Sequence, residues 1–178
     1  MEYRLQTVDV NAVVEQVVAA LHSSIIERGV RVSVDDHLPE TWGDPTAVEQ
    51  VFANLIGNAV NYLDPDRPGV VEIGVVDATD RNGTMHHTYT IKDNGRGIPP
   101  SGMAKLFLAF QRFHEGAAKG EGIGLALVRR IVERLGGKIW VESEQGVGTT
   151  FFVDLPSGPE STDGTPRPQE FERTGKLV

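Results

Sequence analysis

The sequence predicts an α/β sandwich: a mixed, mostly antiparallel sheet of about five strands, with three helices on one face. Several short runs alternate between apolar and polar residues, which is the period of a half-buried strand. Three longer segments instead place apolar residues three and four positions apart, which is the period of an amphipathic helix. Because each kind of element has one apolar face, we expect the two kinds to pack as two layers.

The composition is that of one globular domain. The chain has 178 residues, a formal net charge of −8 and no cysteine. An acidic balance argues against general nucleic-acid binding, which needs a basic face, and the lack of cysteine excludes disulfides and Cys-ligated metal. No apolar run approaches the ~20 residues that span a bilayer, and the first residues lack the order of a signal peptide. We therefore expect a cytoplasmic protein, or the cytoplasmic part of a larger one, without direct membrane insertion.

The first part of the chain predicts a weak edge strand over residues 3–8 and then a helix. Asp9 is a typical N-cap, because its side chain can accept from the first N–H groups, and Gly29 is a typical stop. Residues 30–35 alternate as a half-buried strand, and residues 36–42 predict a loop.

The second helix begins at Asp44, with Pro45 in the first position, where its missing N–H costs nothing. Its apolar stripe comprises Val48, Val51, Phe52, Leu55 and Ala59. Asn54, Asn58 and Asn61 form a second stripe, spaced four and three apart, so they share a face. A solvated polar face is the ordinary explanation for helical asparagines. Their amide oxygens also suit Mg²⁺, so a ligand site stays open.

Residues 70–76 and 88–92 are strands, and residues 80–83 between them carry the chemistry of a hairpin turn, so we expect antiparallel neighbours. The second strand runs into the turn 93–97, Asp-Asn-Gly-Arg-Gly. Its glycines permit positive φ and a close approach of a ligand to the backbone. Its aspartate can accept a hydrogen bond from an exocyclic amine such as that of adenine. Alone, such a turn is usually a plain connection.

Residues 99–120 are expected to form a lid. Their phenylalanines are either core residues or part of a partly ordered flap over a site. The glycine-rich stretch 120–125 then opens a helix through Leu135, and free N–H groups at such a helix start can bind an anion. It matches neither the dinucleotide fingerprint nor a Walker A loop. A ligand would lie between the Asn54 helix, the lid and the Gly124 helix.

The remaining sequence predicts a hairpin of residues 138–142 and 150–155, joined by a tight turn at 146–149. Residues 157–178 are rich in Pro, Gly, Ser, Thr and charge, so we expect a disordered tail. The folded domain is predicted to span residues 1–156.

Five motifs, taken together and in order, carry a family resemblance. The sequences 54–59, 93–97, 107–113, 120–125 and 146–149 resemble the N, first glycine, F, second glycine and third glycine boxes of sensor histidine kinases. The stretches 110–114 and 131–143 are most similar to the bacteriophytochrome-type branch.

The resemblance implies the Bergerat ATP-binding fold of the GHKL superfamily, with ATP and Mg²⁺ as cofactors. By matching position, Asn58 would coordinate Mg²⁺ and Asn54 would support the phosphates. Asp93 would bind the adenine amine, Gly97 would close on the base, and Thr149 would assist through water.

The same resemblance implies that Gly122 and Gly124 face the phosphates, that Arg112 reaches the γ-phosphate from the lid, and that Tyr62 lines the cleft. Further nucleotide-binding residues are expected at Asn61, Gly95, Ile98, Gly120, Ile123 and Leu125.

One position departs from the family pattern. The family usually has lysine three residues after the Mg²⁺ asparagine, where this chain has Asn61. A positive charge near the phosphates is therefore missing, and Lys119 is a candidate to replace it.

The expected chemistry is transfer rather than hydrolysis. Related ATPases carry a glutamate base where this chain has Asn54, and an amide cannot act as a general base. The acceptor histidine is not expected in this chain. Members of the family carry it on a helical hairpin, followed directly by an acid. Only His114 is followed by an acid here, and it lies in the lid rather than on such a helix. The expected partners are the dimerisation and histidine phosphotransfer domain of the same kinase and a response regulator. We expect the isolated domain to be a monomer and the full-length kinase a homodimer.

Two other functions stay open at this point. The chain could be a catalytically degenerate nucleotide-binding interaction module, which the residue at position 61 favours. It could also be a serine kinase of the anti-sigma-factor type.

Overall fold

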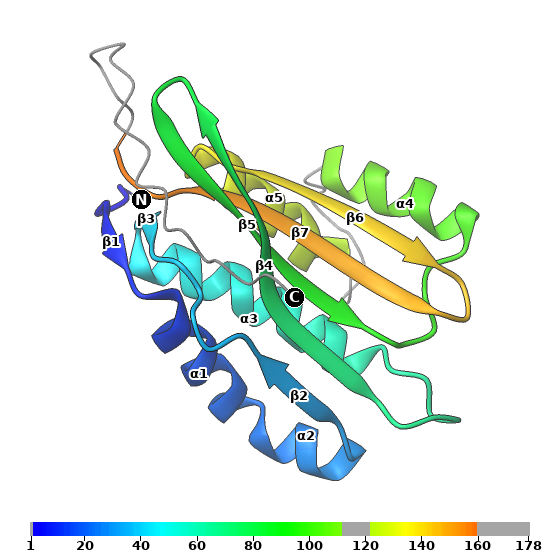
Figure 1. Ribbon diagram of the computed structural model, residues 1–178. Helices are drawn as coiled ribbons and strands as arrows, with labels where there is room; N and C mark the ends of the chain where they lie inside the picture. The colour runs from blue at the N-terminus through cyan, green and yellow to red at the C-terminus, as the bar shows by residue number, and fades with distance from the viewer. Residues whose placement is uncertain (1, 112–121, 160–178) are drawn as a thin grey trace, which may run out of the picture.

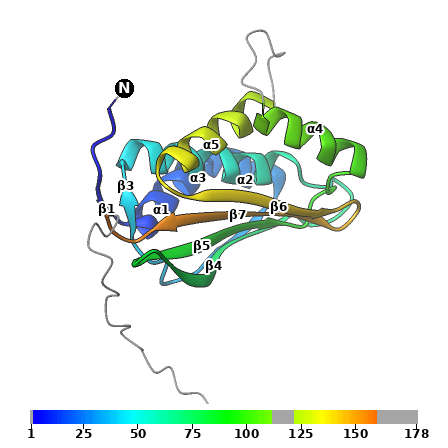
Figure 2. The ribbon, with the colours of Figure 1, turned by 90° about the horizontal axis from the view of Figure 1, so that it is seen from above.

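The computed structural model describes residues 2–111 and 122–159 and contains a five-stranded sheet covered by helices on one face (Figures 1 and 2). The strand order is β2-β4-β5-β7-β6. The β2–β4 pair is parallel, and the three other pairs are antiparallel. Figure 2 shows α1 to α5 on the same side of this sheet. The predicted two-layer α/β sandwich with a mixed, mostly antiparallel sheet is confirmed.

A short second sheet lies at the start of the chain. Strand β1 (Gln6–Val8) pairs antiparallel with β3 (Thr41–Gly43), so the expected loop over 36–42 was wrong at its end. Thr41 is buried, and its hydroxyl donates to the carbonyl of Pro156 at 2.8 Å. A strand of three residues has too few positions to show an alternating pattern, so β3 could not be recognised.

The first predicted helix is two helices, α1 (Val10–Ala20) and α2 (His22–Arg28), which meet at Leu21. The predicted N-cap is confirmed, because the Asp9 carboxylate accepts from the N–H of Ala12 at 3.0 Å. The predicted stop is also confirmed, since Gly29 has a φ of 63°. Strand β2 (Arg31–Val34) follows.

The central helix α3 (Pro45–Asn61) begins as predicted, with Asp44 as its N-cap and Pro45 in the first turn. Every residue of the predicted apolar stripe is buried. Phe52 meets Tyr89 of the sheet edge to face, with ring centroids 5.7 Å apart. This packing fixes the polar face of α3 relative to the ends of the strands.

Strands β4 (Val70–Arg81) and β5 (Thr84–Asp93) form the predicted antiparallel hairpin and are longer than expected. Their turn has positive φ at both Asn82 and Gly83, which is the geometry of a type I′ turn. Strands β6 (Lys138–Glu144) and β7 (Gly148–Pro156) form the second predicted hairpin, and β7 pairs with β5.

One helix lies within the expected lid and another follows it. Helix α4 (Pro100–Gln111) was not predicted, and its Met103 and Leu106 pack partly buried against the core. Helix α5 (Gly122–Arg134) follows the glycine-rich stretch as predicted and ends one residue before Leu135. The lid beyond Gln111 and the tail from residue 160 onward lie outside the described residues. Within the part of the chain that is described, no helix is long and apolar enough to cross a membrane.

Candidate functional site

A cavity of about 390 Å³ opens where the end of α3, the turn after β5, α4, α5 and β7 meet. Its volume falls in the range of small-molecule sites, about 300–1,000 Å³. Predicted site residues from four parts of the sequence line it: Asn58, Tyr62, Asp93, Gly97, Ile98, Leu125 and Thr149. The structure thus brings together residues that are far apart in the chain.

The aspartate at the end of β5 is a buried acceptor in the cavity wall. Asp93 is 7% exposed, and its Oδ1 accepts from the N–H of Gly95 at 2.8 Å. Burial raises the pKa of Asp93, while hydrogen bonds from the backbone N–H groups of Gly95 and Thr149 oppose that rise. A buried carboxylate with further lone pairs can accept from a ligand amine.

The turn after Asp93 packs directly against the β6–β7 turn. Gly97 has a φ of 68°, and a β-carbon there would collide with the backbone carbonyl of Glu144. The N–H of Gly146 donates to the carbonyl of Arg96 at 2.7 Å. Glycine at 97 is therefore required both by its backbone conformation and by the close approach of the second turn.

The hydroxyl of Ser143, which the sequence did not indicate as a site residue, contacts the predicted site residue Thr149. Ser143 of β6 accepts from the N–H of Ile98 at 2.8 Å and donates to the carbonyl of Gly148 at 3.1 Å. Its Oγ lies 2.8 Å from Oγ1 of Thr149. The network fixes the Thr149 hydroxyl beside Asp93.

The predicted asparagines occupy three different environments. Asn58 is half-buried and lines the cavity. Asn54 donates to the carbonyl of Gln50 at 2.8 Å and faces Gly124, where a β-carbon would lie 3.1 Å from Asn54 Oδ1. Asn61 is exposed at the last position of α3 and does not line the cavity.

Several lining residues were missed. Arg96, Pro99 and Phe151 line the cavity beside the predicted residues, as do Gly102, Lys105 and Leu106 of α4. The spacing of those three α4 residues is helical, so a recognised helix over the lid would have indicated a shared face. The pattern around them was too loose to predict that helix.

Of the remaining predicted residues, some lie outside the described part of the chain and two lie at the start of α5. Arg112, Lys119 and Gly120 lie outside the described residues, and Gly122 and Ile123 form the first turn of α5. Among the described residues, no group of three or more His, Asp or Glu side chains could hold a metal ion. Mg²⁺ does not need such a group, because it keeps several waters and often uses only one or two protein oxygens besides phosphate. The amide of Asn58 in the cavity lining can supply one such oxygen.

Residues 43–159 match the family model described as histidine kinase-, DNA gyrase B-, and HSP90-like ATPase. Cyanobacterial phytochrome B of Nostoc sp. is 36% identical over 157 residues, which are 87% of this chain and 20% of that protein. The methanogenesis regulatory histidine kinase FilI of Methanothrix harundinacea is 33% identical over 146 residues, 82% of this chain and 16% of its own length. The chain therefore spans a fifth or less of these two relatives.

Among solved structures, full-length ShkA in complex with AMPPNP superimposes with a TM-score of 0.69. It is 26% identical to this chain, and the match covers 90% of this chain and 33% of ShkA.

Proposed function

Because the chain belongs to the family of histidine kinase-, DNA gyrase B- and HSP90-like ATPases, we propose that it is the ATP-binding catalytic domain of a sensor histidine kinase. It transfers the γ-phosphate of Mg-ATP to a histidine on a separate dimerisation domain. The observation that carries this proposal is the buried Asp93 carboxylate, which shares one cavity with the amide of Asn58. The complex of ShkA with AMPPNP, an ATP analogue, supports the choice of nucleotide.

In this proposal the adenine lies at the Asp93 end of the cavity. The carboxylate accepts from the exocyclic amine, and the Thr149 hydroxyl assists through a water molecule. Ser143 keeps that hydroxyl in place, and Ile98, Leu125 and their apolar neighbours cover the ring. A fixed acceptor in an apolar wall suits a flat heterocycle with one amine.

The phosphates lie at the α3 end. The Asn58 amide oxygen holds Mg²⁺, which offsets phosphate charge when it is bound. Asn54 supports the phosphates next to the start of α5, where N–H groups and the helix dipole favour an anion. Gly124 permits this arrangement, because its missing side chain lets Asn54 approach α5 closely. We further propose that Arg112 reaches the γ-phosphate.

Transfer is favoured over hydrolysis by the chemistry of Asn54. An amide cannot take a proton from water, and the nitrogen of this amide donates to Gln50. A neutral imidazole needs no such base to attack. The new bond joins an imidazole nitrogen to the γ-phosphorus while the bond to the bridging oxygen of ADP breaks. The chain's role is to hold ATP for that attack.

The partners follow from this role. We propose that the acceptor belongs to the dimerisation domain of the same kinase, that a response regulator receives the phosphate next, and that the whole kinase is a phosphorylated cytoplasmic homodimer. The isolated domain is a monomer.

A second candidate is a nucleotide-binding module that has lost catalysis. Asn61 favours it, because this exposed position carries no positive charge toward the phosphates.

Isothermal titration with Mg-ATP, followed by a transfer assay, separates the candidates. The kinase proposal expects ATP binding and label on a supplied histidine-containing dimerisation domain. Binding without transfer to any acceptor favours the degenerate module, and label on a supplied serine-containing regulator favours a serine kinase. Absence of binding contradicts all three.

A further inference from the structure

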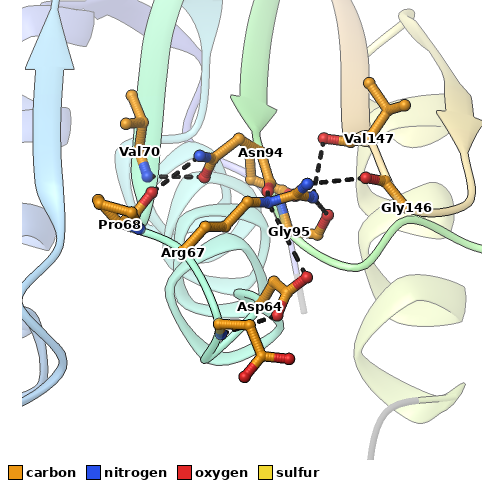
Figure 3. Close-up of polar contacts among 10 residues, drawn as sticks. Asp64, Arg67, Pro68, Val70, Asn94, Gly95, Gly146 and Val147 are labelled. Atoms are coloured by element: carbon orange, nitrogen blue, oxygen red, sulfur yellow. Dashed lines mark hydrogen bonds and ion pairs between the residues drawn. The ribbon is translucent and has the colours of Figure 1, made fainter.

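Four backbone carbonyls converge on the guanidinium of Arg67 (Figure 3). Nε donates to Asn94 at 2.8 Å, and Nη1 donates to Gly146 at 2.8 Å. Nη2 donates to Gly95 at 2.6 Å and to Val147 at 3.3 Å. One side chain therefore contacts two pairs of neighbouring residues that are far apart in the sequence.

These carbonyls belong to two turns beside the cavity, of which the first contributes Arg96 and Gly97 to the cavity lining and the second leads into the lining residue Thr149. Asn94 and Gly95 directly follow Asp93, and the Gly95 N–H holds the Asp93 carboxylate. Gly146 and Val147 form the β6–β7 turn, which leads into Thr149. We define these segments, residues 94–97 and 145–148, as the paired turns. Their direct backbone link is the bond from Gly146 to Arg96.

Arg67 itself is held from a third side. It lies in the segment between α3 and β4, where its Nε is 3.9 Å from the carboxylate of Asp64. The side chain of Asn94 binds the same segment, because it accepts from the N–H of Val70 at 2.8 Å and donates to the carbonyl of Pro68 at 2.9 Å. The guanidinium thus connects the segment that follows α3 with both paired turns.

We propose that Arg67 is a positioning residue, which sets the separation of the paired turns and through them the distance between Asp93 and Thr149. A guanidinium suits this role because its donors are fixed in one plane, whereas an ammonium offers a single point of charge. The expected effect of Arg67 on adenine binding rests on the proposed function. The contact of Arg67 with the paired turns does not depend on that function.

The chain offers a matched control for the loss of an arginine. Arg81 has the same exposed side-chain fraction as Arg67, 34%, and also faces an aspartate, Asp154, at 3.2 Å. It lies at the end of β4 next to the hairpin turn and does not line the cavity. Arg81→Met therefore reports the general effect of removing a half-buried paired arginine.

The first measurement is amide hydrogen exchange without nucleotide. In Arg67→Met, the amides of Gly95, Ile98 and Gly146 should exchange at least tenfold faster than in wild type. In Arg81→Met they should change no more than the amides of the core strands. Equal changes in the exchange rates of these amides in the two variants would show that Arg67 only stabilises the fold in general, and would overturn the proposal.

The second measurement is affinity for ATP, ADP and AMP. Arg67→Met should weaken all three by a similar factor, at least tenfold, because adenine and not phosphate is displaced. Arg67→Lys keeps the charge and should restore less than half of the lost affinity on a logarithmic scale. Full rescue by lysine, or a loss confined to ATP, would contradict the positioning role. Failure of wild type to bind nucleotide would contradict the proposed function instead, and the exchange data would still decide whether Arg67 holds the paired turns.

Discussion

The N–H of Gly95 donates to Oδ1 of Asp93 at 2.8 Å, so the turn that follows this aspartate also orients its carboxylate. Asp93→Asn should abolish or sharply weaken ATP binding, because an amide replaces one acceptor oxygen with a donor facing the adenine amine. Titration calorimetry with ATP and ADP measures the loss. Asp77→Asn, at an exposed position of β4, is the matched control. Wild-type affinity in Asp93→Asn would mean that adenine binds elsewhere.

Nucleotide binding should also change the titration of Asp93. Burial raises the pKa of this carboxyl above the ordinary value of aspartate in the free protein. A ligand amine binds the ionised form, so by linkage bound ADP should lower the pKa of Asp93. Carbon-13 NMR of the Asp93 carboxyl, with and without ADP, measures both values. A pKa that stays the same or rises on binding would contradict a contact with the carboxylate.

The exposed Asn61 at the end of α3 provides a test by gain of affinity. Asn61→Lys adds an ammonium about one turn beyond Asn58, and a charge-assisted bond to phosphate contributes about 1.5–3 kcal/mol. Mg-ATP affinity should rise by about tenfold or more, whereas AMP affinity should change little. Gln16→Lys, at an exposed position of α1, makes the same change of charge away from the cavity. An unchanged ATP affinity would remove the main support for the degenerate module.

The fragment incubated alone with labelled ATP should acquire no acid-labile phosphate. Among the described residues no histidine lines the cavity, and His86 is buried against Asp154 at 3.2 Å. His114 lies outside the described residues. Mass spectrometry and acid lability identify any label. Label that disappears in His114→Ala would show that the acceptor lies within this chain.

The N-cap of α3 makes stability depend on pH in the acid range. Hydrogen bonds from the backbone N–H of Arg4 and then of Ala47 lower the pKa of Asp44. A lowered pKa stabilises the fold above the unfolded value of about 3.9, and this stabilisation is lost as pH falls through the folded pKa. Asp44→Ala should cost about 1 kcal/mol at neutral pH and progressively less in acid. Chemical denaturation at several pH values measures this, with Asp44→Asn as a cap that does not titrate.

Local chemistry made much of the fold predictable. Asp9 and Asp44 begin helices through hydrogen bonds to residues three positions later, and Gly29 ends a helix through its left-handed conformation. The Asn82–Gly83 turn needs only its own backbone conformation. Such features depend only on short stretches of sequence, so the sequence alone indicates them. The comparisons confirm the fold class and the resemblance to histidine kinases. Both were predictable because each motif is local and the order of the motifs is specific.

The missed features depend on distant partners. Strand β3 exists because β1 pairs with it and Pro156 accepts from Thr41. Ser143 and Arg67 are ordinary residues in the sequence, and only the fold brings them into contact with the turn that follows Asp93. Hydrogen bonds between segments so far apart leave no periodic pattern. The roles of the predicted nucleotide-binding residues stay predictions.

The pairing of β5 with β7 joins the two hairpins of the sheet, and we expect it to form late in folding. Asp93 lies opposite Thr149, so the cavity wall closes only after a long intervening segment, including α4 and α5, has been brought back to the sheet. Closing so long a loop carries an entropic cost that local hairpins avoid. We therefore expect the β4–β5 and β6–β7 hairpins to form early and their joining to complete the cavity wall around Asp93 late. A ligand that recognises only the joined state should slow unfolding and leave the rate of folding nearly unchanged.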